Sequence, residues 1–197
     1  DKLKHAADYV EALYQNWFLK ELTGCWTKAI SDNLATLGYV SEIGKQRDFY
    51  SHYVKPLAGK NSRAFVIISD ALRYEVAAEL CDTITRTTKG TAKLDAVQAV
   101  FPSITKFGMA ALLPGRKLSV NDGMDVLVDE MPTRSTDERG KVLRAANMNS
   151  VAVQYTDVLN MKRAERRELV SGKEVVYIYH NTIDAIGDKA PTEKKVF

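Results

Sequence analysis

The stretch FVIISDALRYEVAAEL, residues 65–80, constrains the fold of this 197-residue chain more than any other feature. A continuous apolar run at 64–69 has the length of a strand that is covered on both faces. From residue 71 to residue 81 the apolar positions take up the period of an amphipathic helix. Strand-like and helical segments alternate again further along the chain. Such alternation requires crossover connections and predicts an α/β fold, a mostly parallel sheet sandwiched by helices.

The other elements of this α/β region follow from the same two periodicities. Strands are expected at 93–101, 125–128, 150–155 and 174–180, and helices at 104–113, 135–147 and 159–170. Gly172 is the expected C-terminal stop of the last helix.

The first 60 residues form a separate helical segment in this interpretation. Apolar residues at positions 3, 6, 10, 13 and 17 recur at steps of three and four, which predicts a helix with one buried face. Gly24 is expected to end or bend that helix, and two further helical stretches follow before Gly59. We therefore expect a helical segment at 1–60 and an α/β domain at 61–197.

Composition and charge argue against several classes of protein. With 45% hydrophobic and 27% charged residues, and no apolar run near the roughly 20 residues of a membrane span, we expect a soluble, cytoplasmic chain without a membrane partner. Cys25 and Cys81 form no CxxC pair, which argues against a disulfide framework or a thiolate zinc site. The basic cluster at 161–170 contains interleaved glutamates, so it is a solvated helix face or, alternatively, a phosphate-contacting patch.

Polar residues follow three of the expected strands, where ligands bind in open parallel sheets. Asp70 comes directly after the first strand. One interpretation makes it the N-cap of the next helix, and the other makes it a carboxylate ligand of a metal ion. Both hold if Ser69 caps the helix while Asp70 points into the crevice.

The segment PSIT, residues 102–105, places two hydroxyl groups at the start of an apolar helix. Such hydroxyls are commonly helix caps. Alternatively, Thr105 is a nucleophile at a phosphate-binding helix start, and Ser103 competes with it for that role. Lys106 either neutralises phosphate charge in the substrate or is an ordinary surface residue.

The segment HNTIDAIGD, residues 180–188, is the richest in candidate metal ligands. Asp184 and Asp188 are one helical turn apart and face the same way, so both can grip one cation. His180 is a third ligand, a partner of a ligand, or only a hydrogen-bonding residue. Several carboxylates in one crevice repel each other, and a divalent cation removes that conflict.

Taken together, FVIISDALRYEVAAEL, FPSITKFGMAALLPG and VVYIYHNTIDAIGDKAPTEKKVF resemble the start of the PglZ domain. This branch of the alkaline phosphatase superfamily occurs in bacterial phage-resistance systems, BREX and phage growth limitation. The resemblance covers about residues 60–197, and the first 60 residues resemble the region that precedes the domain in longer PglZ proteins. It implies an alkaline-phosphatase-like fold with two divalent metal ions beside a Ser or Thr nucleophile.

The resemblance also implies roles for individual residues. Asp70 matches a metal ligand, Thr105 matches the nucleophile better than Ser103 does, and Asp184 matches the first ligand of an Asp-x-x-Gly-His pattern. Asp188 stands where the histidine usually is, which shifts the preferred metal from zinc towards manganese or magnesium. The superfamily's later Asp-His pair has no match here. The chain is therefore expected to be the truncated N-terminal part of such a domain, and its activity in isolation stays open.

The expected function is hydrolysis of a phosphoester substrate by a component of a phage-defence complex, with other defence proteins as partners. Two alternatives stay open: a non-catalytic scaffold of the same complex, and a nucleic-acid-binding module that contacts DNA through the basic face at 162–167. Nucleotide-binding enzymes are disfavoured because neither GxxxxGK[ST] nor GxGxxG occurs.

Overall fold

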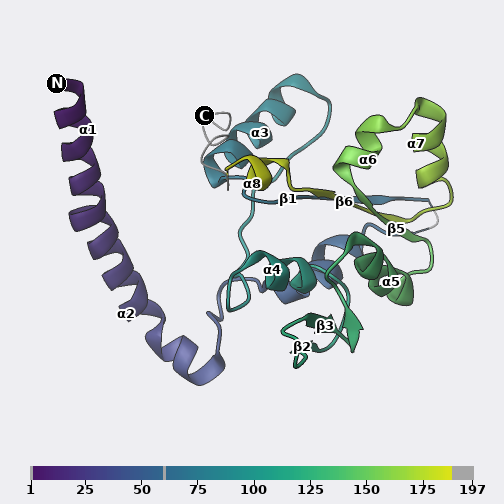
Figure 1. The fold of residues 1–197 in the computed structure, drawn as a ribbon, viewed down its shortest axis with the longest axis horizontal. Helices are drawn as coiled ribbons and strands as arrows, with labels where there is room; N and C mark the ends of the chain where they lie inside the picture. The colour runs from purple at the N-terminus through teal and green to yellow at the C-terminus, as the bar shows by residue number, and fades with distance from the viewer. Residues whose placement is uncertain (1, 60, 188–197) are drawn as a thin grey trace. The chain divides into compact units, whose positions relative to one another are not determined.

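The computed structural model describes residues 2–59 and 61–187. Internal contacts divide the chain into two compact units, residues 1–44 and 45–197, which are described one after the other. Figure 1 shows their elements. None of the helices in the described ranges is both long and apolar enough to cross a membrane.

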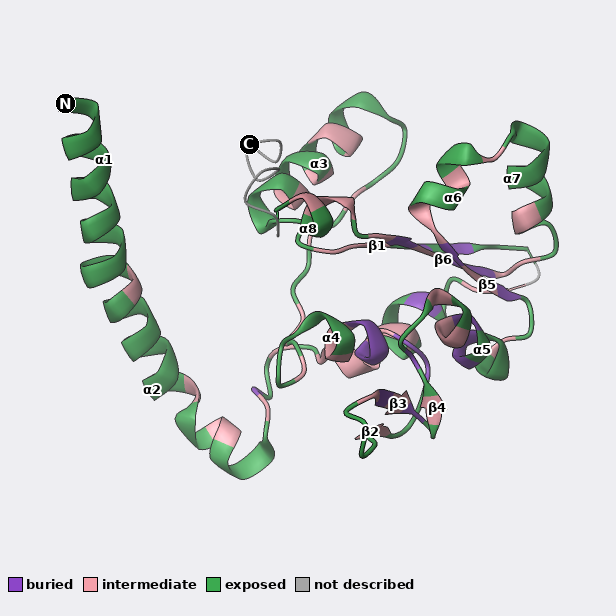
Figure 2. Ribbon diagram, viewed as in Figure 1, coloured by how far each residue is buried: buried purple, intermediate pink, exposed green. Residues whose placement is uncertain are grey.

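The first unit is a run of helix. The α-helix α1 (Lys2–Leu13), the π-helical η1 (Tyr14–Leu19) and the α-helix α2 (Lys20–Leu37) follow one another directly. Gly24 lies within α2 and does not end it; the end comes at Gly38, whose φ of 74° suits glycine. The predicted stripe stays exposed, with Leu3 at 83% and Trp17 at 64% of full exposure, so the expected buried face is not seen within this unit (Figure 2).

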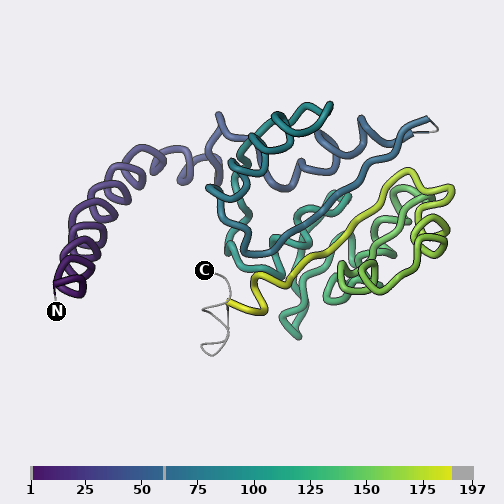
Figure 3. Tube along the Cα trace, turned by 90° about the horizontal axis from the view of Figure 1, so that it is seen from above, coloured from purple at the N-terminus to yellow at the C-terminus, as the bar shows by residue number. Residues whose placement is uncertain are grey.

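The second unit is built on a parallel three-stranded sheet with the strand order β1-β6-β5. These strands are β1 (Ala64–Ser69), β5 (Ser150–Gln154) and β6 (Val175–His180). In the register of β1 and β6, Ala64 lies opposite Val175 and Ser69 lies opposite His180, and Figure 3 shows the two strands running alongside each other. The predicted α/β class is therefore confirmed.

Helices lie on both faces of this sheet, but the expectation that the strand at 64–69 is covered on both faces is wrong. β1 lies at the sheet edge, and its Phe65 and Ile67 are 53% and 66% exposed. Figure 1 shows α4 and α5 on one face, and α3, α6 and α7 on the other. Their bounds, with that of the last helix, are α3 (Tyr74–Thr87), α4 (Thr105–Ala111), α5 (Thr136–Ala146), α6 (Tyr155–Asn160), α7 (Arg163–Val170) and α8 (Thr182–Gly187).

Several expected elements differ in the structure. The strand expected at 93–101 is wrong: this segment has only an isolated bridge from Gln98 to Lys45, and its polar residues Lys93 and Asp95 pair with each other at the surface. The helix expected at 159–170 is interrupted where Met161 takes an extended conformation. Before the sheet, the expected helix is reduced to the 3-10 turn η2 (Gln46–Asp48) and the π-helical η3 (Tyr50–Val54).

The structure also contains a small antiparallel sheet, of which the sequence predicted only the central strand. It consists of β2 (Leu118–Val120), β3 (Val126–Val128) and β4 (Met131–Pro132). The predicted strand at 125–128 is its β3, which pairs with both neighbours.

The hydrophobic core lies between the parallel sheet, α4, α5 and β3. Leu143 of α5 and Val128 of β3 are fully buried, and each such side chain contributes about 1.5–3 kcal/mol by leaving water. Tyr177 of β6 is also fully buried, and its hydroxyl donates to the carbonyl of Leu112 at 2.8 Å. This bond joins the central strand to the end of α4, the helix that begins at Thr105.

Candidate functional site

A cleft of about 740 Å³ opens at the carboxyl ends of the parallel strands, where α4, α5 and α8 also contribute. Four residues predicted from the sequence line it: Asp70, Thr105, His180 and Asp184. The parallel register explains this convergence, because β1 and β6 end side by side and the residues after them emerge at the same edge.

Asp70 lies in a constrained turn after β1. Its backbone N–H donates to the carbonyl of His180 at 2.9 Å, and its carboxylate accepts from the N–H of Ala71 at 3.1 Å. Ala71 has a φ of 60°, a left-handed conformation that costs an L-residue about 1–2 kcal/mol. The alternative that Asp70 or Ser69 caps the next helix is wrong, because α3 begins at Tyr74 after the N-cap Arg73.

Thr105 is the first residue of α4 and faces the cleft. The N-cap of α4 is Ile104, without a side-chain capping bond, so the hydroxyls of PSIT do not cap this helix. Ser103 and Lys106 are not brought to the cleft. The ammonium group of Lys106 instead donates to the carbonyl of Met124 at 3.0 Å.

His180 is fixed by two neighbours. Its Nδ1 lies 2.8 Å from the hydroxyl of Ser69, and its ring meets that of Tyr155 edge-on with centroids 4.7 Å apart. A partner on one ring nitrogen leaves the other available and holds the ring in one orientation. Asp184 lies in the first turn of α8, whereas Asp188 lies outside the described residues.

The charges around the cleft are mostly negative. Its lining contains the four carboxylates of Asp70, Asp137, Asp157 and Asp184 and the two guanidinium groups of Arg134 and Arg139. This excess favours a bound cation. Within 2–59 and 61–187, however, no three His, Cys, Asp or Glu side chains lie close enough together to hold a metal. The described residues thus supply suitable oxygen donors without completing a metal site.

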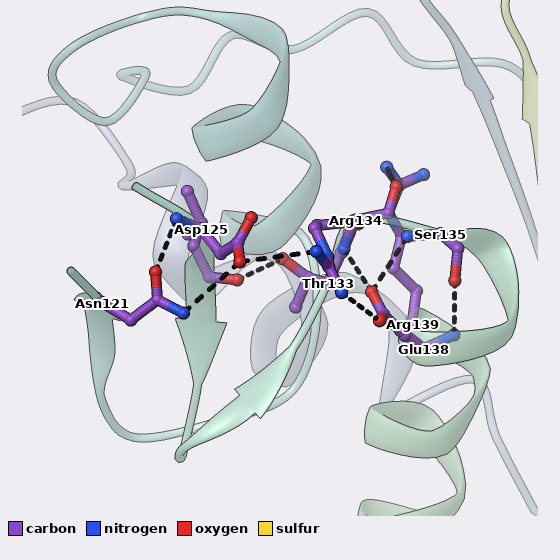
Figure 4. Close-up of polar contacts among 8 residues, drawn as sticks. Asn121, Asp125, Thr133, Arg134, Ser135, Glu138 and Arg139 are labelled. Atoms are coloured by element: carbon purple, nitrogen blue, oxygen red, sulfur yellow. Dashed lines mark hydrogen bonds and ion pairs between the residues drawn. The ribbon is translucent and has the colours of Figure 1, made fainter. Parts of the chain in front are cut away.

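The start of α5 holds a polar network that the sequence interpretation missed (Figure 4). The Ser135 hydroxyl accepts from the N–H of Glu138 at 3.2 Å, and the Glu138 carboxylate accepts from the N–H groups of Ser135 and Arg134 at 3.1 and 2.8 Å. This reciprocal pair is a capping box, whose S-x-x-E signature is present in the sequence STDE. The network fixes the start of α5, where Arg134 precedes the helix, Arg139 lies within it, and both line the cleft.

Tyr179 of β6 forms part of the cleft wall and is only 2% exposed. Burial raises the pKa of its hydroxyl to about 12, although the neighbouring Arg139 acts in the opposite direction. The hydroxyl is therefore protonated at neutral pH, and the ring is an uncharged surface over which the guanidinium group of Arg139 lies.

One residue of the basic cluster at 161–170, Arg166, has a structural role. The guanidinium group of Arg166 donates to the carbonyls of Val158 and Leu159 at 2.9 and 3.0 Å, which ties α7 to α6. None of the residues 161–170 lines the cleft. These contacts favour the interpretation of a solvated helix face.

A larger cleft of about 900 Å³ lies between η3 and the C-terminal end of α5. It contains none of the residues predicted to carry chemistry. Its lining has basic and acidic groups in similar number, among them Arg47 and Asp129. We therefore place the candidate site at the carboxyl ends of the strands.

By its fold and its candidate site, this chain is an α/β protein with a cleft rich in aspartates. Thr105, the first residue of α4, places a hydroxyl group in the lining of that cleft. Residues 49–197 match the family described as the BREX system PglZ alkaline phosphatase-like domain. The chain belongs to this PglZ family, as the sequence resemblance predicted.

Two relatives extend the match over the whole chain. It is 40% identical over 197 residues to the "Alkaline phosphatase-like protein PglZ" of Bacillus cereus (strain H3081.97). It is 42% identical over 200 residues to the "Alkaline phosphatase-like protein BrxZ" of Escherichia coli O9:H4 (strain HS). The chain spans 23% of the length of each relative. No solved structure matches it.

Proposed function

We propose that this chain supplies part of the active site of a metal-dependent phosphoester hydrolase that acts in a BREX phage-defence system. One observation carries the proposal: Asp70, Thr105 and Asp184, which are far apart in the sequence, line one cleft. Membership of an alkaline phosphatase-like family supports the same chemistry. Because the relatives are several times longer, the active protein is proposed to be a longer one that contains this chain.

The donors in the cleft fit a divalent cation in kind. Asp70 and Asp184 offer carboxylate oxygens, which suit manganese or magnesium as well as zinc, and His180 offers the ring nitrogen that Ser69 does not occupy. Bound there, one or two such ions would supply positive charge against the phosphoryl oxygens and lower the pKa of the attacking hydroxyl. Further ligands are proposed to come from the rest of the full-length protein.

Thr105 is the proposed nucleophile. Its hydroxyl oxygen bonds to phosphorus as the bond from phosphorus to the leaving oxygen breaks, and its proton passes to solvent. Water then breaks the bond between Thr105 and phosphorus, which restores the hydroxyl and releases phosphate from a monoester or a phosphate monoester from a diester. The position of Thr105 at the start of α4, inside the cleft, supports this assignment over Ser103, which does not line it.

Conservative substitutions in the full-length protein test the proposal. Thr105→Val and Asp70→Asn keep side-chain shape, and each is expected to lower the hydrolysis of a generic aryl phosphoester at least about 1000-fold. Ser103→Ala is the matched control and is expected to retain activity. Wild-type turnover by both the Thr105 and the Asp70 variants would overturn the assignment, provided that thermal unfolding shows both to be folded.

A non-catalytic scaffold is the second candidate. It is favoured by the finding that the described residues contain no group of three metal-ligating side chains. A scaffold that keeps the fold would assemble with other defence proteins and show no turnover. Full-length protein that binds metal and its partners but hydrolyses no phosphoester would support this candidate.

A further inference from the structure

Arg139 is held firmly in the wall of the cleft that also contains Thr105. Its Nε donates to the carbonyl of Thr133 at 2.8 Å, and its Nη2 donates to the carbonyl of Arg134 at 3.3 Å. The guanidinium carbon lies 4.7 Å from the centre of the buried Tyr179 ring. Two main-chain acceptors and an aromatic surface therefore fix both the position and the plane of this cation.

The charge of Arg139 is not neutralised by a carboxylate in the part of the chain that the structure describes. Its neighbour Arg134 differs, because it pairs with Asp125 at 3.6 Å and with Glu138 at 3.4 Å. The main-chain bonds of Arg139 use one N–H of Nε and one of Nη2, and its guanidinium group also interacts with the Tyr179 hydroxyl, so at least two of its five N–H groups are left for another acceptor.

We infer that Arg139 binds the non-bridging oxygens of the phosphoester that Thr105 attacks. A planar guanidinium group that is fixed but unpaired matches the geometry and charge of a phosphoryl group. It also offsets the repulsion that an anionic substrate meets from the aspartates of the cleft. The inference rests on the proposed function for the identity of the substrate and adds the residue that orients it.

Inorganic phosphate is the probe for this role in the full-length protein. Its dissociation constant is measured by calorimetry, and its inhibition constant is measured against hydrolysis of an aryl phosphoester. Arg139→Gln is expected to raise both constants and the KM at least about tenfold, because charged hydrogen bonds to phosphate are lost. Arg144→Gln is the control, since Arg144 is an exposed arginine of the same helix outside the cleft.

A lysine variant separates charge from geometry. Arg139→Lys keeps the charge without the planar fork, so it is expected to recover only part of the phosphate affinity. It also serves as the deciding variant if Arg139→Gln fails to fold in thermal unfolding.

The outcomes separate this inference from the proposed hydrolase. Hydrolysis that continues with unchanged phosphate affinity in both Arg139 variants overturns the inference and leaves the hydrolase standing. Phosphate binding that depends on Arg139 in a protein without turnover supports the phosphate site and contradicts the hydrolase. If Arg144→Gln weakens phosphate binding as much as Arg139→Gln does, the effect comes from general surface charge, and this result also overturns the inference.

Discussion

Replacing Glu138 with glutamine tests the network that positions the arginines of the cleft (Figure 4). The Glu138 carboxylate accepts from two amides at 2.8 and 3.1 Å, and its side chain is 18% exposed. Both amides donate to the same oxygen, Oε2, and the Nη2 of Arg134 donates to Oε1 at 3.4 Å. Glutamine has nearly the same shape and can keep both amides on its one oxygen, but it has no charge and its NH2 group replaces the oxygen that accepts from Arg134. The loss of one bond and of the charge at a helix N-terminus is expected to cost about 1.5 kcal/mol. That free energy corresponds to a fall in Tm of roughly 3–6 °C for a chain of this size.

The pH dependence of this effect identifies its cause. Burial alone would raise the pKa of Glu138, but hydrogen bonds from the Ser135 and Arg134 amides and the Arg134 charge together lower it. The stabilisation is therefore complete above the unfolded pKa of 4.5 and is lost as the pH falls through the lower, folded-state pKa. Thermal unfolding of both proteins from about pH 7 to about pH 2 should show a gap in Tm that closes on acidification. A gap of constant size would refute the electrostatic explanation.

Two further predictions concern the core behind the cleft and use urea unfolding. Leu143→Ala is expected to lower the free energy of unfolding by about 3 kcal/mol, since it leaves a cavity at a fully buried position. Met148→Ala, at a position that is 78% exposed, should change it by less than about 0.5 kcal/mol. Tyr177→Phe is expected to cost about 1 kcal/mol through loss of the bond to Leu112, and no cost would show that this bond is not formed.

Local patterns in the sequence predicted most of the parallel sheet and its helices. The apolar run of β6 is continuous because this central strand is buried on both faces, and that pattern is readable without a structure. The apolar run of β1 predicted the strand but not its burial, because β1 lies at the sheet edge and leaves Phe65 and Ile67 exposed. The prediction of a strand at 93–101 failed because a strand-like sequence pattern does not reveal whether a neighbouring strand pairs with it. The stripe of the first helix likewise predicted the helix correctly but not whether its apolar face is covered.

Reasoning from strand ends located the candidate site, because Asp70 follows β1, His180 is the last residue of β6 and Asp184 follows it, and these strands end at one edge. The same rule applied to β5 would have found Asp157, three residues beyond its end. Arg139 could not be found in this way. Its position depends on a stack with Tyr179, forty residues later in the sequence, and that contact exists only after the sheet and α5 have packed together.

Anomalous diffraction from crystals of the full-length protein, grown with manganese, tests the central claim most directly. The account predicts a metal ion bound by the carboxylates of Asp70 and Asp184, at about 2.0–2.6 Å, within reach of the Thr105 hydroxyl. Metal located elsewhere in the protein, or a cleft that binds none while the protein hydrolyses phosphoesters, would contradict it.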